Sequence, residues 1–490
     1  MTEEITEKKN LNSYRNILKG TSFFGGVQLF NIILTLVRGK FVAIILGPEG
    51  MGISALFTSA SNTIQRFANL GVNQAIIKKV AEEKEPAEQL RSVATSLQLI
   101  NLTALLGLII CVAFCIPLSR ITFGDESYWW QFMMLGAGVW LAMAGGGKLT
   151  VLQGLHEVKR ISKASIVGGV TGLGVGIPLY YIFGYKGIVP AIIAVFLALY
   201  IFYSINLNRC VKGLKVGWNL KENFPLAKSI LFLGLVLMSG TLISSLVEYL
   251  INLYVRSNGS VDDVGLYQAA NSVTNQFSGM IFSALAMDYF PRLSAVAADN
   301  DKMSTVVNRQ SEIVSWLMTP AMTLLILSAP LIIRVLLSES FTQIIPLMRW
   351  MGVGMLLRAF SFPMAYITFA KGNKKVFFIL EGIVANSLTL VLSCLFFHFF
   401  GLIGLGYALV ADNGACLIIY YFVNRKLYGY NFSSASLINF IIGGIITAGC
   451  FVFSFFTSAA LSFSLMGIFG AGALVWGFIN IKKVYQNKNL

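Results

Sequence analysis

Long apolar stretches separated by short polar loops run through almost the whole chain. Windows of roughly 20 apolar residues mark segments long enough to cross a bilayer as helices. They fall at 17–46, 50–70, 92–118, 129–152, 161–183, 187–207, 227–255, 264–288, 311–336, 342–370, 375–398, 402–424, 434–456 and 460–481. This pattern predicts an all-α integral membrane protein of about 14 transmembrane helices.

The composition supports a membrane protein. Of 490 residues, 56% are hydrophobic and only 12% are charged, unlike an average soluble domain. The net charge of +15 comes from 37 Lys and Arg residues, of which about 27 lie in loops on the side of the N-terminus. We therefore expect both termini in the cytoplasm. Because these basic residues occupy short loops, we do not expect nucleic-acid binding.

Two halves of the chain repeat one another. Three short matches occur in order at nearly constant offsets, which are 213, 215 and 217 residues: Gly52-Ile53 with Gly265-Leu266, Lys159-Arg160 with Lys374-Lys375, and Gly184-x-x-Gly187 with Gly401-x-x-Gly404. Six helices per half make the halves parallel repeats about an axis along the membrane normal.

The repeat predicts the domain organisation. We expect an N-lobe at 1–208, a cytoplasmic linker at 209–226, a C-lobe at 227–426, and two further helices at 427–490 that have no partner in the repeat. This is the arrangement of two six-helix lobes with a C-terminal appendix.

Polar side chains recur at helical spacing on four of the predicted spans. Steps of three and four residues place each set on one helix face. The sets are Gln28, Asn31, Thr35 and Arg38; Thr58, Asn62, Arg66 and Asn69; Thr241, Ser245, Glu248 and Asn252; and Gln268, Asn271 and Asn275. Such stripes can hold helices together. Their recurrence in both repeats, with charges on three of them, favours a water-filled cavity between the lobes.

Cations without nearby acids mark the first half. Arg38, Lys40, Arg66 and Lys148 lie in or beside the first six spans, which contain no Asp or Glu. Intramembrane charge is costly and marks a pathway by default. The cations therefore need a negative partner elsewhere, on an anionic substrate or on Glu248. Arg38 and Glu248 sit at similar depth in their spans, which predicts that they approach when the outer mouth is closed. The alternative is that each is satisfied within its own lobe.

Charges of the second half are further candidates. Arg358 lies deep enough in its span to face the cavity. Asp412, near the middle of its span, can carry a proton, sense a cation, or bond to a neighbouring helix. Asp288 and Arg292, four residues apart at a helix end, predict a local or gating ion pair.

Several motifs resemble a known transporter family. Leu46-Gly47-Pro48-Glu49-Gly50-Met51-Gly52 resembles the LGPxGxG signature of the polysaccharide branch of the MOP exporter superfamily. Asp263 to Gln268 and Pro291-Arg292-Leu293-Ser294 are similar to the second-lobe counterpart in Wzx-type flippases. Leu337 to Phe341 and Ala370-Lys371-Gly372 extend the likeness, which covers roughly 15–425.

The resemblance implies a function. Its members export a lipid-linked oligosaccharide, such as an O-antigen repeat unit on undecaprenyl diphosphate, from the cytoplasmic to the periplasmic leaflet of the bacterial inner membrane. They alternate between two open states and use H⁺ or Na⁺ gradients or the membrane potential. A polysaccharide polymerase is the implied protein partner. No cofactor or metal is implied.

Two other functions remain open from the sequence. An ion-coupled multidrug exporter of the same superfamily is expected to carry an intramembrane acid in the first lobe, where this chain has Arg38. A membrane enzyme that polymerises polysaccharide needs a large outer loop, and the outer loops here are short. We expect a transporter rather than an enzyme.

Overall fold

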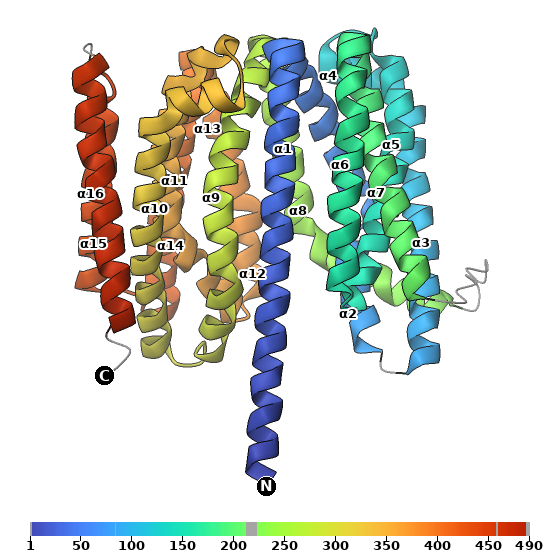
Figure 1. Ribbon diagram of the computed structural model, residues 1–490, viewed down its shortest axis with the longest axis horizontal. Coiled ribbons are helices and arrows are strands. Elements are labelled where there is room, and N and C mark those ends of the chain that lie inside the picture. The colour runs from blue at the N-terminus through green and yellow to red at the C-terminus, as the bar shows by residue number, and fades with distance from the viewer. Residues whose placement is uncertain (1, 84, 212–222, 457–458, 487–490) are drawn as a thin grey trace. The chain divides into compact units, whose positions relative to one another are not determined.

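The computed structural model describes residues 2–83, 85–211, 223–456 and 459–486, which are helical without any strand (Figure 1). The α-helices are α1 (Thr2–Asn69), α2 (Val72–Glu82), α3 (Pro86–Ala113), α4 (Cys115–Phe123), α5 (Trp129–Gly154), α6 (Val158–Phe183), α7 (Ile188–Cys210), α8 (Phe224–Asn258), α9 (Val261–Ala295), α10 (Asn300–Leu336), α11 (Ile345–Ala370), α12 (Lys374–Phe377), α13 (Ala385–Phe400), α14 (Gly404–Tyr428), α15 (Ser434–Phe453) and α16 (Ala459–Gln486). The shorter elements are η1 (Gly184–Gly187), η2 (Glu339–Ile344), η3 (Phe378–Val384) and η4 (Gly401–Ile403).

The predicted all-α class and helix number are confirmed. Nine helical stretches of the described chain are long and apolar enough to cross a membrane. Three of these contain a break, at Gly47, at Gly184–Gly187 and at Gly401–Ile403, so each holds two spans. The bent α8 and the 35-residue α9 complete the 14 helices.

Some boundaries differ from the windows read from hydropathy. The segment 92–118 divides at Phe114, between α3 and α4. Pro117 explains the break, because a proline ring clashes with the carbonyl four residues earlier and supplies no N–H. The loop before α3 also contains a short helix, α2, that the windows did not separate.

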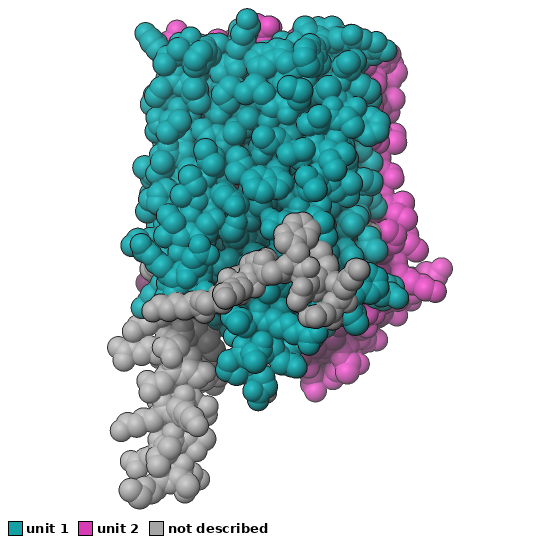
Figure 2. All heavy atoms as spheres, turned by 90° about the vertical axis from the view of Figure 1, so that its right-hand side faces the viewer, with its two compact units in different colours: residues 1–46, 53–249 teal, residues 47–52, 250–490 magenta. Residues whose placement is uncertain are grey.

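Contacts within the chain define two compact units (Figure 2). Unit 1 comprises 1–46 with 53–249, and unit 2 comprises 47–52 with 250–490. This division lies inside α8, whereas the predicted lobes follow the sequence repeat and meet in the linker 209–226. Residues 212–222 of that linker lie outside the described residues, and the lobes stay a prediction.

Close helix contacts in unit 1 depend on small residues of α6, among them Gly168 and Gly172. A Cβ atom on Gly172 would lie 2.7 Å from the Cα of Val195, and one on Gly168 would lie 3.2 Å from the Cα of Leu199. Larger side chains would therefore separate α6 from α7.

The first part of α8 packs inside unit 1. The Thr63 hydroxyl donates to the backbone oxygen of Ser245 at 3.2 Å, and the hydroxyls of Thr122 and Tyr249 are 2.6 Å apart. At the other end of this contact, a Cβ on Gly71 would lie 2.0 Å from the Gly234 oxygen. The α8 segment up to Tyr249 thus lies directly against the second half of α1.

The internal repeat is visible in backbone contacts. A Cβ on Gly187 would meet the Leu179 oxygen at 2.1 Å, and a Cβ on Gly404 would meet the Phe396 oxygen at 2.0 Å. Both pairs are related by the same offset that relates Gly187 to Gly404 in the sequence. The two halves therefore make the same tight turn with the same glycine.

A second repeat-related contact lies in unit 2. A Cβ on Gly52 would lie 2.0 Å from the Val261 oxygen, and a Cβ on Gly265 would lie 1.9 Å from the Pro48 oxygen. The offset that relates Gly52 to Gly265 also relates Pro48 to Val261, so the contact is reciprocal. It joins the turn after the first span to the start of α9, and only glycine permits it.

Candidate functional site

The second half of α1 carries the residues from which the site is built. After the turn at Gly47, whose φ is 66°, the helix continues to Asn69. Asn62, Arg66 and Asn69 recur at steps of four and three residues and therefore share one face. Leu70 and Gly71 then take positive φ values of 51° and 69°, which turns the chain into α2.

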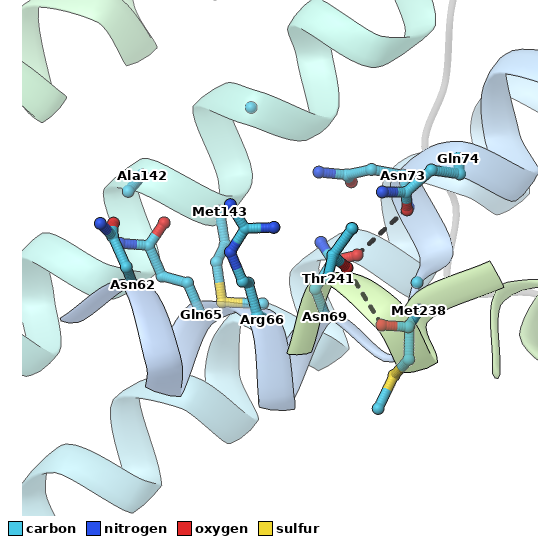
Figure 3. Close-up of a pocket in the computed structure, with 12 residues that line it drawn as sticks. Asn62, Gln65, Arg66, Asn69, Asn73, Gln74, Ala142, Met143, Met238 and Thr241 are labelled. Atoms are coloured by element: carbon cyan, nitrogen blue, oxygen red, sulfur yellow. Dashed lines mark hydrogen bonds between the residues drawn. The ribbon is translucent and has the colours of Figure 1, made fainter. Parts of the chain in front are cut away.

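These residues line a pocket of about 280 Å³ inside unit 1 (Figure 3). Helices α1, α2, α5 and α8 form its walls. The lining residues are Asn62, Gln65, Arg66, Asn69, Gly71, Asn73, Gln74, Ala142, Met143, Gly146, Met238 and Thr241. Small residues of α5 leave the space, and five carboxamide side chains make it polar.

Arg66 is the only charged residue among those that line the pocket. Its side chain is exposed and projects from the same side of α1 as Asn62 and Gln65. Arg66 acts electrostatically on the carboxylate of Glu248, on α8. Its guanidinium makes no hydrogen bond or close ion pair with any residue of the described chain. Its five N–H donors are therefore available to a ligand.

The amides around Arg66 are only partly satisfied. Gln65 donates to the Ser61 hydroxyl at 2.9 Å, and the backbone N–H of Asn73 donates to the Asn69 side-chain oxygen at 3.2 Å. The Asn73 side-chain oxygen is buried and has no hydrogen-bond partner among the described residues. Buried polar groups are normally paired. The Asn73 oxygen is therefore an unpaired acceptor within the pocket wall, beneath its surface.

The polar stripe on the first half of α1, which contains Asn31 and Arg38, does not line this pocket. The Nε of Arg38 donates to the Tyr180 hydroxyl of α6 at 3.2 Å. Asn31 accepts a hydrogen bond from Thr35 through its backbone oxygen, and its side chain is half-buried. The side chain of Gln28 lies outside the described residues. Arg38 thus bonds to α6, whereas Arg66 lines the pocket without a bonded partner among the described residues, and approach of Arg38 to Glu248 stays a prediction.

One hydrogen bond joins the polar stripes of α8 and α9, and a second lies within the stripe of α9. Gln268 donates to the buried side chain of Asn252 at 3.0 Å, and Asn275 donates to Asn271 at 2.7 Å. Both bonds lie within unit 2. In this region the polar side chains hold helices together or satisfy one another, as polar residues often do in membrane bundles.

Unit 2 contains a separate group of ionisable side chains on α11, η3 and α14. Asp412 is buried and accepts a hydrogen bond from Thr389 at 2.8 Å. Glu381 interacts electrostatically with Tyr420, and its Oε1 is buried without a partner among the described residues. Arg358 acts electrostatically on both carboxylates and lies 5.8 Å from the Phe282 ring centroid.

The element that carries Glu381 is η3, a seven-residue π-helix. π-Helical segments are rare in proteins overall, and those that occur are often found at functional sites. The Asn386 side chain donates to the Glu381 backbone oxygen at 2.7 Å, so it satisfies a carbonyl that the irregular backbone leaves open. The sequence indicated Asp412 and Arg358, but did not show that Glu381 joins them.

Two smaller predictions have clear outcomes. Asp288 and Arg292 form an ion pair of 2.6 Å, which confirms the local pair, and Arg292 also donates to Gln310 at 3.2 Å. Lys148 lies 3.6 Å from the centroid of the Tyr200 ring. The ammonium group of this half-buried lysine therefore makes a cation–π contact with Tyr200.

The sequence reasoning missed the contribution of α2. Asn73 and Gln74 were not on any predicted span, yet both line the pocket. The signal was available, because buried residues recur at Val72, Ala75, Ile76 and Val80, the spacing of a short amphipathic helix. Asn73 and Gln74 fall between them at the start of this helix.

Fold and pocket together define a polytopic membrane protein with a two-repeat transporter fold. The fold is similar to that of the lipid II flippase MurJ in an inward closed conformation, with a TM-score of 0.71 and 14% identity over 96% of this chain and 100% of that chain. It is also similar to an inward-facing multidrug resistance MATE transporter of the MOP superfamily, with a TM-score of 0.63 and 17% identity over 83% and 98% of the two chains.

Sequence comparison assigns the family. The chain belongs to the polysaccharide biosynthesis protein family, whose model matches residues 41–346. It is 24% identical over 379 residues to the lipid III flippases of Escherichia coli strain K12 and Shigella flexneri, covering 75% of this chain and 88% of theirs. The resemblance to the polysaccharide branch of the MOP superfamily is confirmed.

Proposed function

We propose that this protein is a flippase for a lipid-linked oligosaccharide, an O-antigen repeat unit or a similar glycan on undecaprenyl diphosphate. It moves the head group from the cytoplasmic to the periplasmic leaflet of the bacterial inner membrane, with both chain termini in the cytoplasm. The observation that carries the proposal is the unpaired guanidinium of Arg66 in a pocket lined otherwise by amides, small residues, two methionines and a threonine.

The chemistry of such a substrate matches the pocket. A diphosphate requires cationic hydrogen-bond donors, for which the planar guanidinium of arginine is well suited. A glycan requires many neutral hydrogen-bonding groups, which carboxamides supply as both donors and acceptors. The lipid chain requires only the bilayer beside the protein. The lipid III flippases among the relatives support the same class of substrate.

The mechanism that we propose is alternating access between the two repeats. Arg66 holds the diphosphate near the cytoplasmic end of its span, and Arg38 provides a second cation nearer the outer end of the preceding span. Glu248 neutralises Arg66 electrostatically when the pocket holds no phosphate. In the C-lobe, Asn271, Asn275 and Arg358 contribute to the cavity in the open states.

Coupling to an ion gradient is assigned to the acidic group of unit 2. Asp412 is buried, Glu381 is half-buried, and both are under the electrostatic influence of Arg358. Binding of H⁺ or Na⁺ there changes the charge of a buried cluster, which biases the helices that carry it. The Asp288–Arg292 pair serves as a gate at the cytoplasmic end of α9.

Reconstituted liposomes test the proposal. Purified protein should transfer a fluorescent polyprenyl-diphosphate oligosaccharide from the outer to the inner leaflet, where a membrane-impermeant glycosidase cannot reach it. Arg66→Gln should slow this transfer, and Arg425→Gln, at an exposed arginine outside the pocket, should not. Transfer at the rate of protein-free liposomes would reject the flippase.

A multidrug exporter is the second candidate function, favoured by the fold similarity to MATE transporters. It predicts that cells lacking the protein become sensitive to cationic drugs and retain normal surface glycans. The flippase predicts the opposite result, in which an untranslocated lipid-linked glycan accumulates in the cytoplasmic leaflet. A glycan polymerase partner would then act on the exported unit.

A further inference from the structure

A second hollow of unit 1 is an apolar groove between the first half of α1 and the end of α6, which lie side by side (Figure 1). Its volume is about 500 Å³. Helix α1 contributes Phe41, Ile44 and Ile45, and α6 contributes four residues of the segment 177–182. Ile44 is 56% exposed and Tyr181 is 81% exposed, so the groove opens at the surface of unit 1. Within a bilayer this surface meets hydrocarbon, and the groove therefore fits a lipid chain.

The groove is closed at one end by contacts between the same two helices. The Nε–H of Arg38 donates to the Tyr180 hydroxyl at 3.2 Å, and Tyr180 is only 1% exposed. About one turn further from the groove, a Cβ on Gly169 would lie 2.6 Å from the Cδ1 of Leu34, so α1 and α6 touch there. The space between the helices therefore ends at Arg38.

A cation thus stands at the closed end of the groove. Arg38 precedes Phe41 by three residues and Ile45 by seven, so all three share one face of α1. The guanidinium has five N–H donors, of which only Nε–H is bonded to a described residue. None of the ion pairs among the described residues includes Arg38. Because a charge within a membrane is costly without a partner, this end of the groove fits an anionic group.

The cation, rather than the groove, selects the occupant. Lipid chains are as apolar as the walls of the groove, so in a bilayer the walls alone do not prefer one chain over another. Arg38 requires an anion at its own depth. It lies nine residues before the turn at Gly47, which is about 13 Å along the helix. The hydrocarbon layer is about 30 Å thick, so Arg38 lies near its middle.

This depth excludes an ordinary phospholipid as the source of the anion. When the chains of a phospholipid fill the groove, its phosphate lies in the headgroup region, outside the hydrocarbon layer. A lipid diphosphate whose head group is being carried across the membrane passes the depth of Arg38. Such a lipid can place its chain in the groove and its phosphate at the closed end at the same time.

We infer that the groove holds the first part of the substrate's polyprenyl chain while the diphosphate lies at Arg38, halfway across the membrane. The groove extends over four to five residues of each helix, or about 6–8 Å, so it holds a short section of the chain. The remainder lies in the bilayer. This inference rests on the proposed flippase function and adds the path by which the lipid chain leaves unit 1.

Photolabelling of the purified protein in lipid nanodiscs tests the inference without transport. Two probes are farnesyl diphosphate and farnesol, each with a diazirine in its first isoprene unit, and the third is a phosphatidylglycerol with a diazirine in one acyl chain. At equal membrane concentration, the diphosphate probe should label residues 41–45 and 177–182 about tenfold more than the others, the factor that a charged hydrogen bond provides. Equal labelling by the three probes, measured by mass spectrometry of the peptides, would overturn the inference.

Substitution of Arg38 tests the role of the cation. The measured quantity is the ratio of groove labelling by the diphosphate probe to labelling by the farnesol probe, so that a change in access to the groove cancels. Arg38→Gln should lower this ratio from about ten to about one, because the charged donor is lost. Arg38→Lys keeps the charge and should retain a ratio of about three or more. An unchanged ratio in Arg38→Gln would overturn the inference.

Blocking the groove tests its part in transport. Ile44→Trp fills the groove from an exposed position and should slow transfer of a lipid-linked oligosaccharide in liposomes about threefold or more, since the chain loses its packing contacts. Val175→Trp is the matched control, because Val175 is 50% exposed on α6 but does not line the groove. Equal transfer rates for the two variants would contradict the inference.

The flippase proposal and the chain site can fail separately. If wild type shows the expected labelling ratio but transfers no lipid in liposomes, the flippase proposal fails and the chain site stands. If wild type transfers lipid but the diphosphate probe labels the groove no more than farnesol does, the chain site is wrong and the flippase proposal stands.

Discussion

The pocket of unit 1 and the acidic group of unit 2 are both polar sites among apolar helices, but their bonding differs. In unit 1 the charged residue, Arg66, faces open space and has no hydrogen-bond partner in the described chain. In unit 2 Asp412 is buried and bonded to Thr389 on the neighbouring helix. A charge that faces space can receive a large ligand, whereas a buried charge can exchange only a proton or a small ion.

The difference separates two tasks that one transporter needs. Substrate binding requires donors and acceptors that are not yet used. Coupling requires a buried group whose change of charge is costly enough to move helices. We therefore propose recognition by α1 and α2 and coupling by α11, η3 and α14, a division that the first two of the following four experiments can contradict.

The largest expected effect follows removal of the free cation. Arg66→Gln should reduce translocation of a lipid-linked oligosaccharide in liposomes by about tenfold or more, because a charged hydrogen bond contributes roughly 1.5–3 kcal/mol. Arg66→Lys should retain part of the rate, since a point charge replaces a bidentate donor. If Arg66→Gln transports at the normal rate, the pocket of unit 1 does not recognise the substrate.

Neutralising the buried acid should have a smaller and different effect. Asp412→Asn retains the side-chain shape and an acceptor for Thr389, but it cannot take up a proton at neutral pH. We expect the stimulation of transport by an imposed ion gradient to fall about tenfold, which corresponds to a typical coupling free energy. Substrate affinity should be unchanged. Asp301→Asn, at an exposed acid of α10, is the matched control. Weakened substrate binding in Asp412→Asn would place recognition in unit 2.

The reciprocal glycine contact should show its effect in stability. Gly265→Ala brings a Cβ to 1.9 Å from the Pro48 oxygen, so the turn and α9 must separate. We expect a loss of about 1–3 kcal/mol in unfolding free energy, the usual cost of overpacking. Gly444→Ala has nothing within 4 Å and should be neutral or slightly stabilising. Thermal unfolding in detergent measures the stability of both variants. If Gly265→Ala and Gly444→Ala have equal melting temperatures, the contact at Gly265 opens without cost.

The smallest expected effect concerns pH at the same contact. Burial raises the pKa of Asp262, and the neighbouring carboxylates of Glu49 and Asp263 raise it further. The folded protein therefore holds this proton more tightly than the unfolded chain, so acidification through the raised pKa adds stability, which is lost again as the pH rises. Melting temperatures over about pH 4–7 should show a weaker gain on acidification in Asp262→Asn than in wild type. Parallel curves of melting temperature against pH in the two proteins would exclude Asp262 as the source of the pH dependence.

Much of the fold could be predicted from hydropathy. The spans were visible because a bilayer demands about 20 apolar residues, and this length is recorded in the sequence. The offsets of the repeat led to the glycines of the tight turns, Gly187 and Gly404, which make equivalent backbone contacts. Helix α2 and the π-helix η3 were missed, since short amphipathic helices and bulges leave little hydropathy signal.

The candidate site was predictable only in part. Helical spacing placed Asn62, Arg66 and Asn69 on one face, and that face does line the pocket. The same argument applied to Asn252 and Gln268, yet these two bond to each other. Spacing reports which side chains share a face, and it does not report what the face meets.

The sequence by itself determined the number of helices, the duplication of the chain and the positions of intramembrane charge, because each follows from local composition and period. Only the tertiary structure decided which charges keep free donors. Arg38 meets Tyr180, Lys148 meets Tyr200, and Arg66 meets open space. A hydrogen bond between helices depends on side chains far apart in the sequence, so the unpaired cation becomes identifiable only when the helices are packed.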